Sequence, residues 1–257
     1  MRLSRVLAAA TAAFFIAGCD SSPTTPEVNV DAALNQMASS SISGYSTAAM
    51  SMPAGAMMPS STPGSSASSC PYNTTTRFFD CSPVTSNNVT FTRSYQLLDA
   101  SGTALTTPNP LLVASIRSII DIEGTIAATG PNPATTEIDR HEDATLSGLQ
   151  SASRVLNGTA TQRVSVTGSS FGFVANDTST TTGLLLPTTQ AQKYPLGGTI
   201  ITSGTVSMSG ATTSTQTHRR EISFDGTSVM TVKITIGTSV TTCRINMETP
   251  GVAPVCS

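Results

Sequence analysis

A serine, an aspartate and a histidine occur along this chain in an order that hydrolytic catalysis could use. Residues 168–172, Gly-Ser-Ser-Phe-Gly, match the pattern Gly-x-Ser-x-Gly, and Asp177 and His218 follow. A serine activated by a histidine base, which an aspartate orients, can attack an acyl carbon. The motif works at a sharp turn between a strand and a helix, whereas residues 175–193 are rich in Thr and predict a long loop. We therefore assign no catalytic residue and expect a protein that is not an enzyme.

A second group of residues, Asp139, His141 and Asp143, alternates along a predicted strand. Alternate residues of a strand point to the same side of a sheet, so two carboxylates and an imidazole share one face. Such a set could bind a divalent metal, particularly if His218 came near. The other interpretation is a solvated strand face, where charged residues are ordinary, and the charges that flank the group favour it. The sequence therefore predicts neither a metal nor another cofactor.

Four of the five cysteines form an even set in the second part of the chain: Cys70, Cys81, Cys243 and Cys256. The wide spacing within each pair does not fit a tetrathiolate zinc site. Four cysteines allow three disulfide connectivities. Pairing of Cys70 with Cys81 and of Cys243 with Cys256 is favoured, because each pair brackets a short loop that contains Pro.

The N-terminus has the organisation of an export signal. Residues 1–5 contain two arginines, and residues 6–17 form an apolar run that is too short to span a bilayer. The run ends in Ile-Ala-Gly-Cys at residues 16–19. This arrangement resembles the lipobox of bacterial lipoproteins. The resemblance implies that residues 1–18 are a signal peptide and that Cys19 carries acyl chains such as palmitate. These chains would anchor the protein in the inner or outer membrane of the bacterial cell envelope, facing the periplasm or the cell surface.

The stretch after the lipidated cysteine, residues 19–69, predicts a flexible tether. It contains no Lys or Arg after Cys19 and is rich in Ser, Thr, Pro, Gly and Ala. The one periodic part is residues 29–40, where Val30, Ala33, Leu34 and Met37 have helical spacing. A short helix there either docks on the folded domain or forms transiently within the tether.

Residues 70–257 predict an antiparallel β domain. Ile116, Ile120 and Ile122 alternate with charged residues, and residues 229–236 alternate in the same way. The dipeptides Asn157-Gly158 and Asp225-Gly226 are strong signals for hairpin turns. No segment of helical length separates the strands. The predicted fold class is therefore mainly β, namely an antiparallel meander, sandwich or open barrel with one Thr- and Ser-rich wet face.

The composition excludes some functional classes but does not identify the function. The formal net charge of −2 excludes a basic nucleic-acid-binding protein. The 38% of apolar residues suffice for a hydrophobic core. We expect the chain to be monomeric. The first functional hypothesis is a non-enzymatic surface-display or protein-interaction module. The alternative is a half-barrel carrier or binding protein for a lipid or other apolar ligand, by architectural analogy with half-barrel lipoprotein carriers. A large apolar pocket on the concave face would favour the carrier, and a filled core the interaction module.

Overall fold

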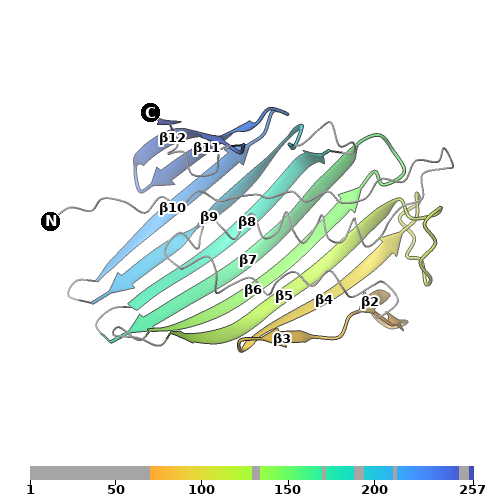
Figure 1. The fold of residues 1–257 in the computed structure, drawn as a ribbon, viewed down its shortest axis with the longest axis horizontal. Coiled ribbons are helices and arrows are strands. Elements are labelled where there is room, and N and C mark those ends of the chain that lie inside the picture. Colours follow the sequence, from red (N-terminus) through yellow and green to blue (C-terminus); the bar gives the residue numbers. More distant parts are fainter. Residues whose placement is uncertain (1–69, 129–133, 170–171, 188–193, 211–212, 249–254) are drawn as a thin grey trace.

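The structure, a computed structural model, describes residues 70–128, 134–169, 172–187, 194–210, 213–248 and 255–257 (Figure 1). The predicted signal peptide, Cys19, the tether and its short helix over residues 29–40 lie outside the described residues. No helix among the described residues is long and apolar enough to cross a membrane.

The described residues form strands joined by turns and loops. The strands are β1 (Tyr72–Asn73), β2 (Phe78–Asp80), β3 (Val84–Ser86), β4 (Val89–Leu98), β5 (Ser115–Ala128), β6 (Ala134–Ser147), β7 (Arg154–Gly168), β8 (Gly172–Leu186), β9 (Gly197–Ser209), β10 (Ser214–Ser223), β11 (Val229–Ile236), β12 (Ser239–Asn246) and β13 (Val255–Cys256).

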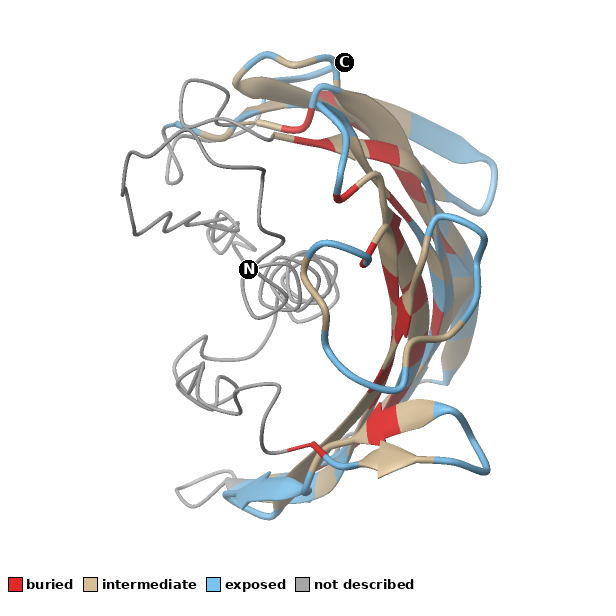
Figure 2. Cartoon of the chain, turned by 90° about the vertical axis from the view of Figure 1, so that its right-hand side faces the viewer, coloured by how far each residue is buried: buried red, intermediate tan, exposed pale blue. Residues whose placement is uncertain are grey.

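All strands belong to one antiparallel sheet that follows the order of the chain. The sheet order is β1-β2-β4-β5-β6-β7-β8-β9-β10-β11-β12-β13, and β3 pairs with the outer edge of β4. Long neighbouring strands are therefore joined as hairpins, which makes the sheet a meander. The sheet is bent into an open trough and is not closed into a barrel (Figure 2). The predicted mainly-β antiparallel class is confirmed.

The two faces of the sheet differ sharply in burial. Along β6, the even-numbered residues from Thr136 to Leu146 are buried, whereas the odd-numbered residues between Thr135 and His141 are exposed. The cross-strand register carries this alternation to the neighbouring strands. Loop residues Val113 and Leu149 belong to the same buried cluster, and the loops fold over the hollow side of the trough (Figure 2). The buried face is therefore the concave face, and the other is the exposed face.

The apolar core occupies the part of the concave face next to these loops. We call this part the loop sector, and it comprises Tyr95, Leu97, Val113, Ile116, Leu146, Leu149, Leu156, Leu184 and Leu186. Its first five members are completely buried. Each large apolar side chain buried in this way stabilises the fold by about 1.5–3 kcal/mol. The loop sector is thus the filled core that holds the open sheet together.

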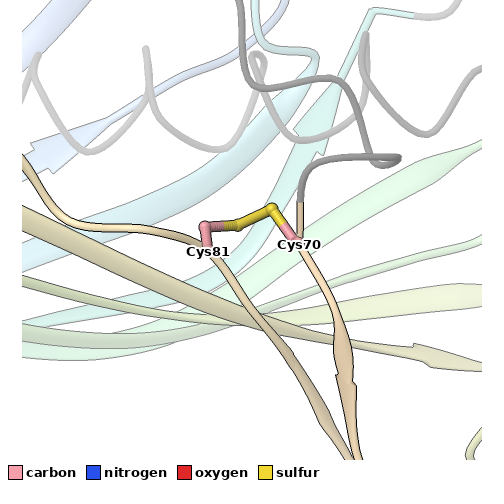
Figure 3. The surroundings of a disulfide bond; sticks show 2 residues. All are labelled: Cys70 and Cys81. Atoms are coloured by element: carbon pink, nitrogen blue, oxygen red, sulfur yellow. A yellow bond between two sulfur atoms is a disulfide. The ribbon is translucent and has the colours of Figure 1, made fainter.

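Two disulfides tie short segments to the two edges of the sheet. Cys70 is bonded to Cys81 at the β1–β2 edge (Figure 3), and Cys243 is bonded to its cross-strand partner Cys256 in β13. The predicted local pairing is confirmed. Short, covalently held edge strands leave little unpaired backbone for another sheet to join.

Two local predictions were wrong. Asn157-Gly158 is not a hairpin turn but lies inside β7, at a β-bulge opposite β8. A Cβ at Gly158 would lie 2.7 Å from the Cβ of Ala144, so the glycine serves close packing rather than a turn. Residues 175–186 of the predicted loop belong to β8, because β-branched threonines fit a pleated strand well. The predicted chain reversal at Asp225-Gly226 is confirmed, and Gly226 has a positive φ of 85°. It is a longer loop over residues 224–228 and not a two-residue turn, since Asp225 does not have a positive φ.

Candidate functional site

Two rows of mainly polar side chains cross the middle of the concave face, from β6 to β10. Members of a row are direct cross-strand partners, and the two rows are two residues apart on every strand. We call them together the polar belt. The first row is Glu142, Ala160, Ser179, Thr202 and Arg220, and the second row is Arg140, Gln162, Asp177, Gly204 and His218.

Apolar side chains flank the polar belt on both sides. The loop sector lies on one side. The other side, which we call the distal sector, comprises Ile138, Val164, Val166, Phe173, Ala175, Val206 and Met208. Most of these side chains are only partly buried, and Met208 is 47% exposed. The concave face is therefore filled at one end and partly accessible at the other.

A buried ion pair lies at the β6 end of the polar belt. Arg140 donates from Nη2 to Glu142 Oε2 over 2.6 Å and from Nη1 to Gln162 Oε1 over 3.0 Å. Arg140 is only 6% exposed and Glu142 only 8%. Buried charges of this kind persist because each one compensates the other, and removing one partner leaves an uncompensated charge in the interior.

A second buried pair, between Asp177 and His218, spans the intervening strand β9. Asp177 Oδ1 lies 3.1 Å from His218 Nε2, and the Asp177 side chain is 8% exposed. The two side chains meet above Gly204, where a Cβ would lie 2.1 Å from Asp177 Oδ1. Burial raises the pKa of Asp177, while the positive charge of His218 and Arg220 acts in the opposite direction. The missing side chain at Gly204 is therefore what allows this pair to form.

Arg220 ends the first row of the polar belt. Its Nη2 donates to Thr202 Oγ1 over 3.4 Å, and Thr202 donates in turn to Ser179 Oγ over 3.2 Å. Burial lowers the pKa of Arg220, and Asp177 partly restores it. Arg220 Nε is buried and donates no hydrogen bond to any residue that the structure describes. This guanidinium is thus incompletely satisfied within a largely buried environment.

A small cavity interrupts the first row. It has a volume of about 30 Å³ and lies where the small residues Gly158 and Ala160 of β7 stand between Glu142 and Ser179. Its remaining lining is mixed: the polar members are Arg140, Thr159 and Thr181, and the apolar members are Ala144, Leu156, Leu184 and Ile200. A space of this size holds about one water molecule.

Comparison with known proteins assigns no role to the polar belt. No protein-family model matches the chain, and neither does any curated protein or solved structure. A functional assignment therefore depends on the geometry and chemistry of these residues.

The structure brings together two members of the hydrolase-like set, and the third lies outside the described residues. Asp177 and His218 are paired, whereas Ser170 lies outside the described residues. The segment is bounded by the antiparallel strands β7 and β8, not by a strand and a helix. Gly172, the last residue of the motif, is five extended residues or about 17 Å from Asp177. The strand–turn–helix context that a serine nucleophile needs is not present in the residues that flank the motif.

The predicted metal group lies on the exposed face, but His141 and Asp143 are each engaged with a different residue of β5. His141 Nδ1 lies 2.6 Å from Asp121 Oδ1. Arg117 donates from Nε and Nη2 to the two carboxylate oxygens of Asp143, over 2.9 and 2.5 Å, which lowers the pKa of Asp143. Within the described ranges, no group of three or more such ligands is arranged to hold a metal ion, and His218 lies on the opposite face from Asp139.

The polar belt was missed at the sequence level, although part of its signal is present. Arg140 and Glu142 have the same parity as Ile138, Ala144 and Leu146, and that parity is the buried one in β6. Two charged residues that share parity with core residues indicate a buried polar site. His218 and Arg220 share parity with the buried Ile222, so β10 carries part of the same signal. Which of these side chains meet those of β8 depends on the register between strands.

Proposed function

We propose that this chain is a lipid-anchored binding protein of the bacterial cell envelope and that the concave face of its open sheet holds an apolar or amphipathic ligand. The resemblance of residues 16–19 to a lipobox supports the anchor at Cys19. One structural observation carries the binding role: the partly exposed apolar distal sector adjoins a polar belt that is buried or partly buried.

The contrast within the concave face supports a ligand rather than a structural core at the distal end. The loop sector is almost completely buried, and the loop residues Val113 and Leu149 belong to it. In the distal sector, Val164, Val166, Phe173 and Val206 are only partly buried. The cavity that the described residues enclose on this face is only about 30 Å³, so a ligand would lie on the open distal sector rather than in a deep pocket. Apolar side chains beside a few convergent polar groups are the features that ligand sites share.

The proposed role is non-enzymatic. In the polar belt, the acidic and basic groups are engaged mainly with each other, as in the pairs Arg140–Glu142 and Asp177–His218. The first row supplies hydroxyl groups from Ser179 and Thr202, and these are hydrogen-bonded to each other. This arrangement favours holding a polar group over activating a nucleophile.

Native mass spectrometry of the exported, unlipidated Cys19→Ala chain tests the binding role. We expect a co-purified ligand mass on this chain and on the control Thr205→Asp, which changes the exposed face. The ligand should be lost from Val206→Asp, which places a charge in the distal sector one residue away. A bare chain in every case, or equal ligand retention by the two aspartate variants, would contradict the proposal.

The anchor has its own test. Cys19→Ala should abolish labelling by a fatty-acid analogue and release the protein from the membrane fraction, because residues 16–19 are the only anchor signal that we recognise. Cys70→Ala, paired with Cys81→Ala, is the matched control and should remain labelled. Equal labelling of the wild type and Cys19→Ala would refute lipidation at this position.

A protein-interaction module is the second candidate, and exposed apolar loop residues favour it. Leu111 is 61% exposed and Leu112 51%. Adjacent apolar side chains in a surface loop are typical of protein contacts. A photo-crosslinking residue at position 112 should then capture one defined envelope protein in cells, whereas the same residue at Thr161 on the exposed face should not. Equal capture at the two positions counts against a specific interaction.

A further inference from the structure

Arg117 and Arg220 differ in what the Nε and Nη2 atoms of their guanidinium groups bind. On the exposed face, Arg117 uses Nε and Nη2 to hold both oxygens of the Asp143 carboxylate. On the concave face, Nε of Arg220 has no acceptor among the described residues, and its Nη2 makes only the 3.4 Å contact with Thr202. The two donors that bind a carboxylate in Arg117 are therefore almost without acceptors in Arg220.

The carboxylate closest to Arg220 in the polar belt does not fill this role. Asp177 is directed to His218, at 3.1 Å, and no hydrogen bond from Arg220 to Asp177 is formed. Arg140, by contrast, donates to both Glu142 and Gln162. Arg220 is therefore the arginine of the polar belt with capacity for an external carboxylate.

The residues around Arg220 indicate which kind of molecule would carry this carboxylate. Thr202 is the cross-strand partner of Arg220, and β9 continues from Thr202 over Gly204 to Val206 and Met208 in the distal sector. Thr202 and Val206 are about 13 Å apart along an extended strand. A molecule that starts at Arg220 and follows β9 crosses the Asp177–His218 pair and then meets apolar side chains.

We propose that the concave face binds a single-chain carboxylate amphiphile, with its head group on the Nε–Nη2 edge of Arg220 and its acyl chain over the distal sector. The proposal rests on the proposed function, and it adds the ligand class and the residue that selects it. Charge complementarity supports it. On the described strands, the concave face carries four arginines, Arg93, Arg140, Arg154 and Arg220, against two carboxylates, Glu142 and Asp177.

The chain offers a clean reporter, because it contains no Trp. In the full Cys19→Ala chain, Phe173→Trp places the sole indole in the distal sector, and Thr178→Trp places it on the exposed face of the same strand. Titration with dodecanoate, below the concentration at which it forms micelles, should change the emission of the Phe173→Trp protein and leave that of Thr178→Trp unchanged. Equal responses, or none, overturn the proposal.

Neighbouring arginines on opposite faces test the head-group contact. In the Phe173→Trp chain, Arg220→Gln should weaken dodecanoate binding by about tenfold or more, the usual effect of losing a charged hydrogen bond. Arg219→Gln, whose side chain pairs with Glu221 on the exposed face, should change it by less than about twofold. Dodecanol, which has the same chain without the charge, should bind all three proteins equally.

Further measurements test the proposed ligand class even if Arg220→Gln disturbs folding. Arg220→Lys keeps the charge but loses the two-donor edge, so it should retain only part of the preference for dodecanoate over dodecanol, with an unchanged circular dichroism spectrum. If dodecanol binds the parent chain as tightly as dodecanoate, the carboxylate preference is wrong, although the ligand-binding function stands. If neither probe binds while native mass spectrometry still detects a ligand sensitive to Val206→Asp, the ligand class alone is refuted.

Discussion

The two faces of this sheet place similar ionic groups in opposite electrostatic situations. On the exposed face, a hydrogen bond from Arg117 lowers the pKa of Asp143. On the concave face, burial raises the pKa of Asp177, even though His218 and Arg220 lie near it. The difference shows that surroundings, not the presence of a cationic neighbour, decide the sign of the shift.

The charge content of the two faces differs as well. The strands of the exposed face carry the basic residues Arg117, Arg163, Arg219, Lys233 and Arg244 and the acidic residues Asp80, Asp121, Glu123, Glu137, Asp139, Asp143 and Glu221. Acids are in excess there, whereas arginines are in excess on the concave face. The exposed face behaves as a solvated surface, and the concave face has the charge to attract an anion.

The largest expected difference between the faces comes from neighbouring carboxylates. Glu142→Gln leaves Arg140 as an incompletely compensated buried charge and should reduce the free energy of unfolding by about 3–5 kcal/mol. Asp143→Asn, one residue away, breaks a partly exposed pair, whose side chains are 42% and 30% exposed, and should cost about 1 kcal/mol or less. Urea unfolding of both variants measures this contrast, and equal losses would remove the distinction.

A smaller effect is expected from the close approach at Gly204. Gly204→Ala places a Cβ 2.1 Å from both Asn176 O and Asp177 Oδ1, so β8 and β9 must separate locally. We expect a loss of about 1–3 kcal/mol in unfolding free energy. Ser203→Ala changes the exposed face and should stay within about 0.5 kcal/mol of the wild type. Thermal unfolding of the two variants provides the comparison.

The smallest effect concerns pH, and it has opposite signs on the two faces. The lowered pKa of Asp143 gives stability that is present above its unfolded-state value and is lost as pH falls through its folded-state value. The raised pKa of Asp177 favours the folded state below the unfolded-state value, and this contribution is lost as pH rises through the higher folded-state value.

These signs can be measured with two asparagine variants. Relative to Asp143→Asn, the wild type should gain unfolding free energy as pH rises from strongly acidic values through the usual range of a carboxyl group. Relative to Asp177→Asn, it should lose unfolding free energy as pH rises from that range towards neutrality. Curves of the same sign for the two variants would show that Asp177 is not governed by burial.

The sequence allowed the faces of the sheet to be predicted well, because alternation with a period of two is a local property. Ile116, Ile120 and Ile122 indeed share the concave face. The Asn157-Gly158 turn failed for the opposite reason. The dipeptide indicates only a local preference for a turn. In the structure, Gly158 is required because β7 packs closely against Ala144. Long-range packing prevailed over a local preference.

The contacts within the polar belt could not be predicted from alternation alone. Asp177 and His218 are separated by the whole of β9, and they meet only because the β8–β9 and β9–β10 registers place both opposite Gly204. Hairpin lengths and bulges set these registers, and a shift of one residue would place His218 on the other face. The pairing of Arg219 with Glu221 and the separation of Arg220 from it, by contrast, follow from the alternation of side chains along β10 itself.

The most direct test of the concave face as the binding surface is photoaffinity labelling with a fatty acid that carries a diazirine near the end of its chain. Labelled positions in the Cys19→Ala chain would be located by peptide mass spectrometry. The account predicts labels on Val164, Phe173 and Val206 in the distal sector, and competition by unlabelled dodecanoate. Labels on the exposed-face residues Thr161, Thr178 and Thr205 instead, or an even distribution over both faces, would contradict it.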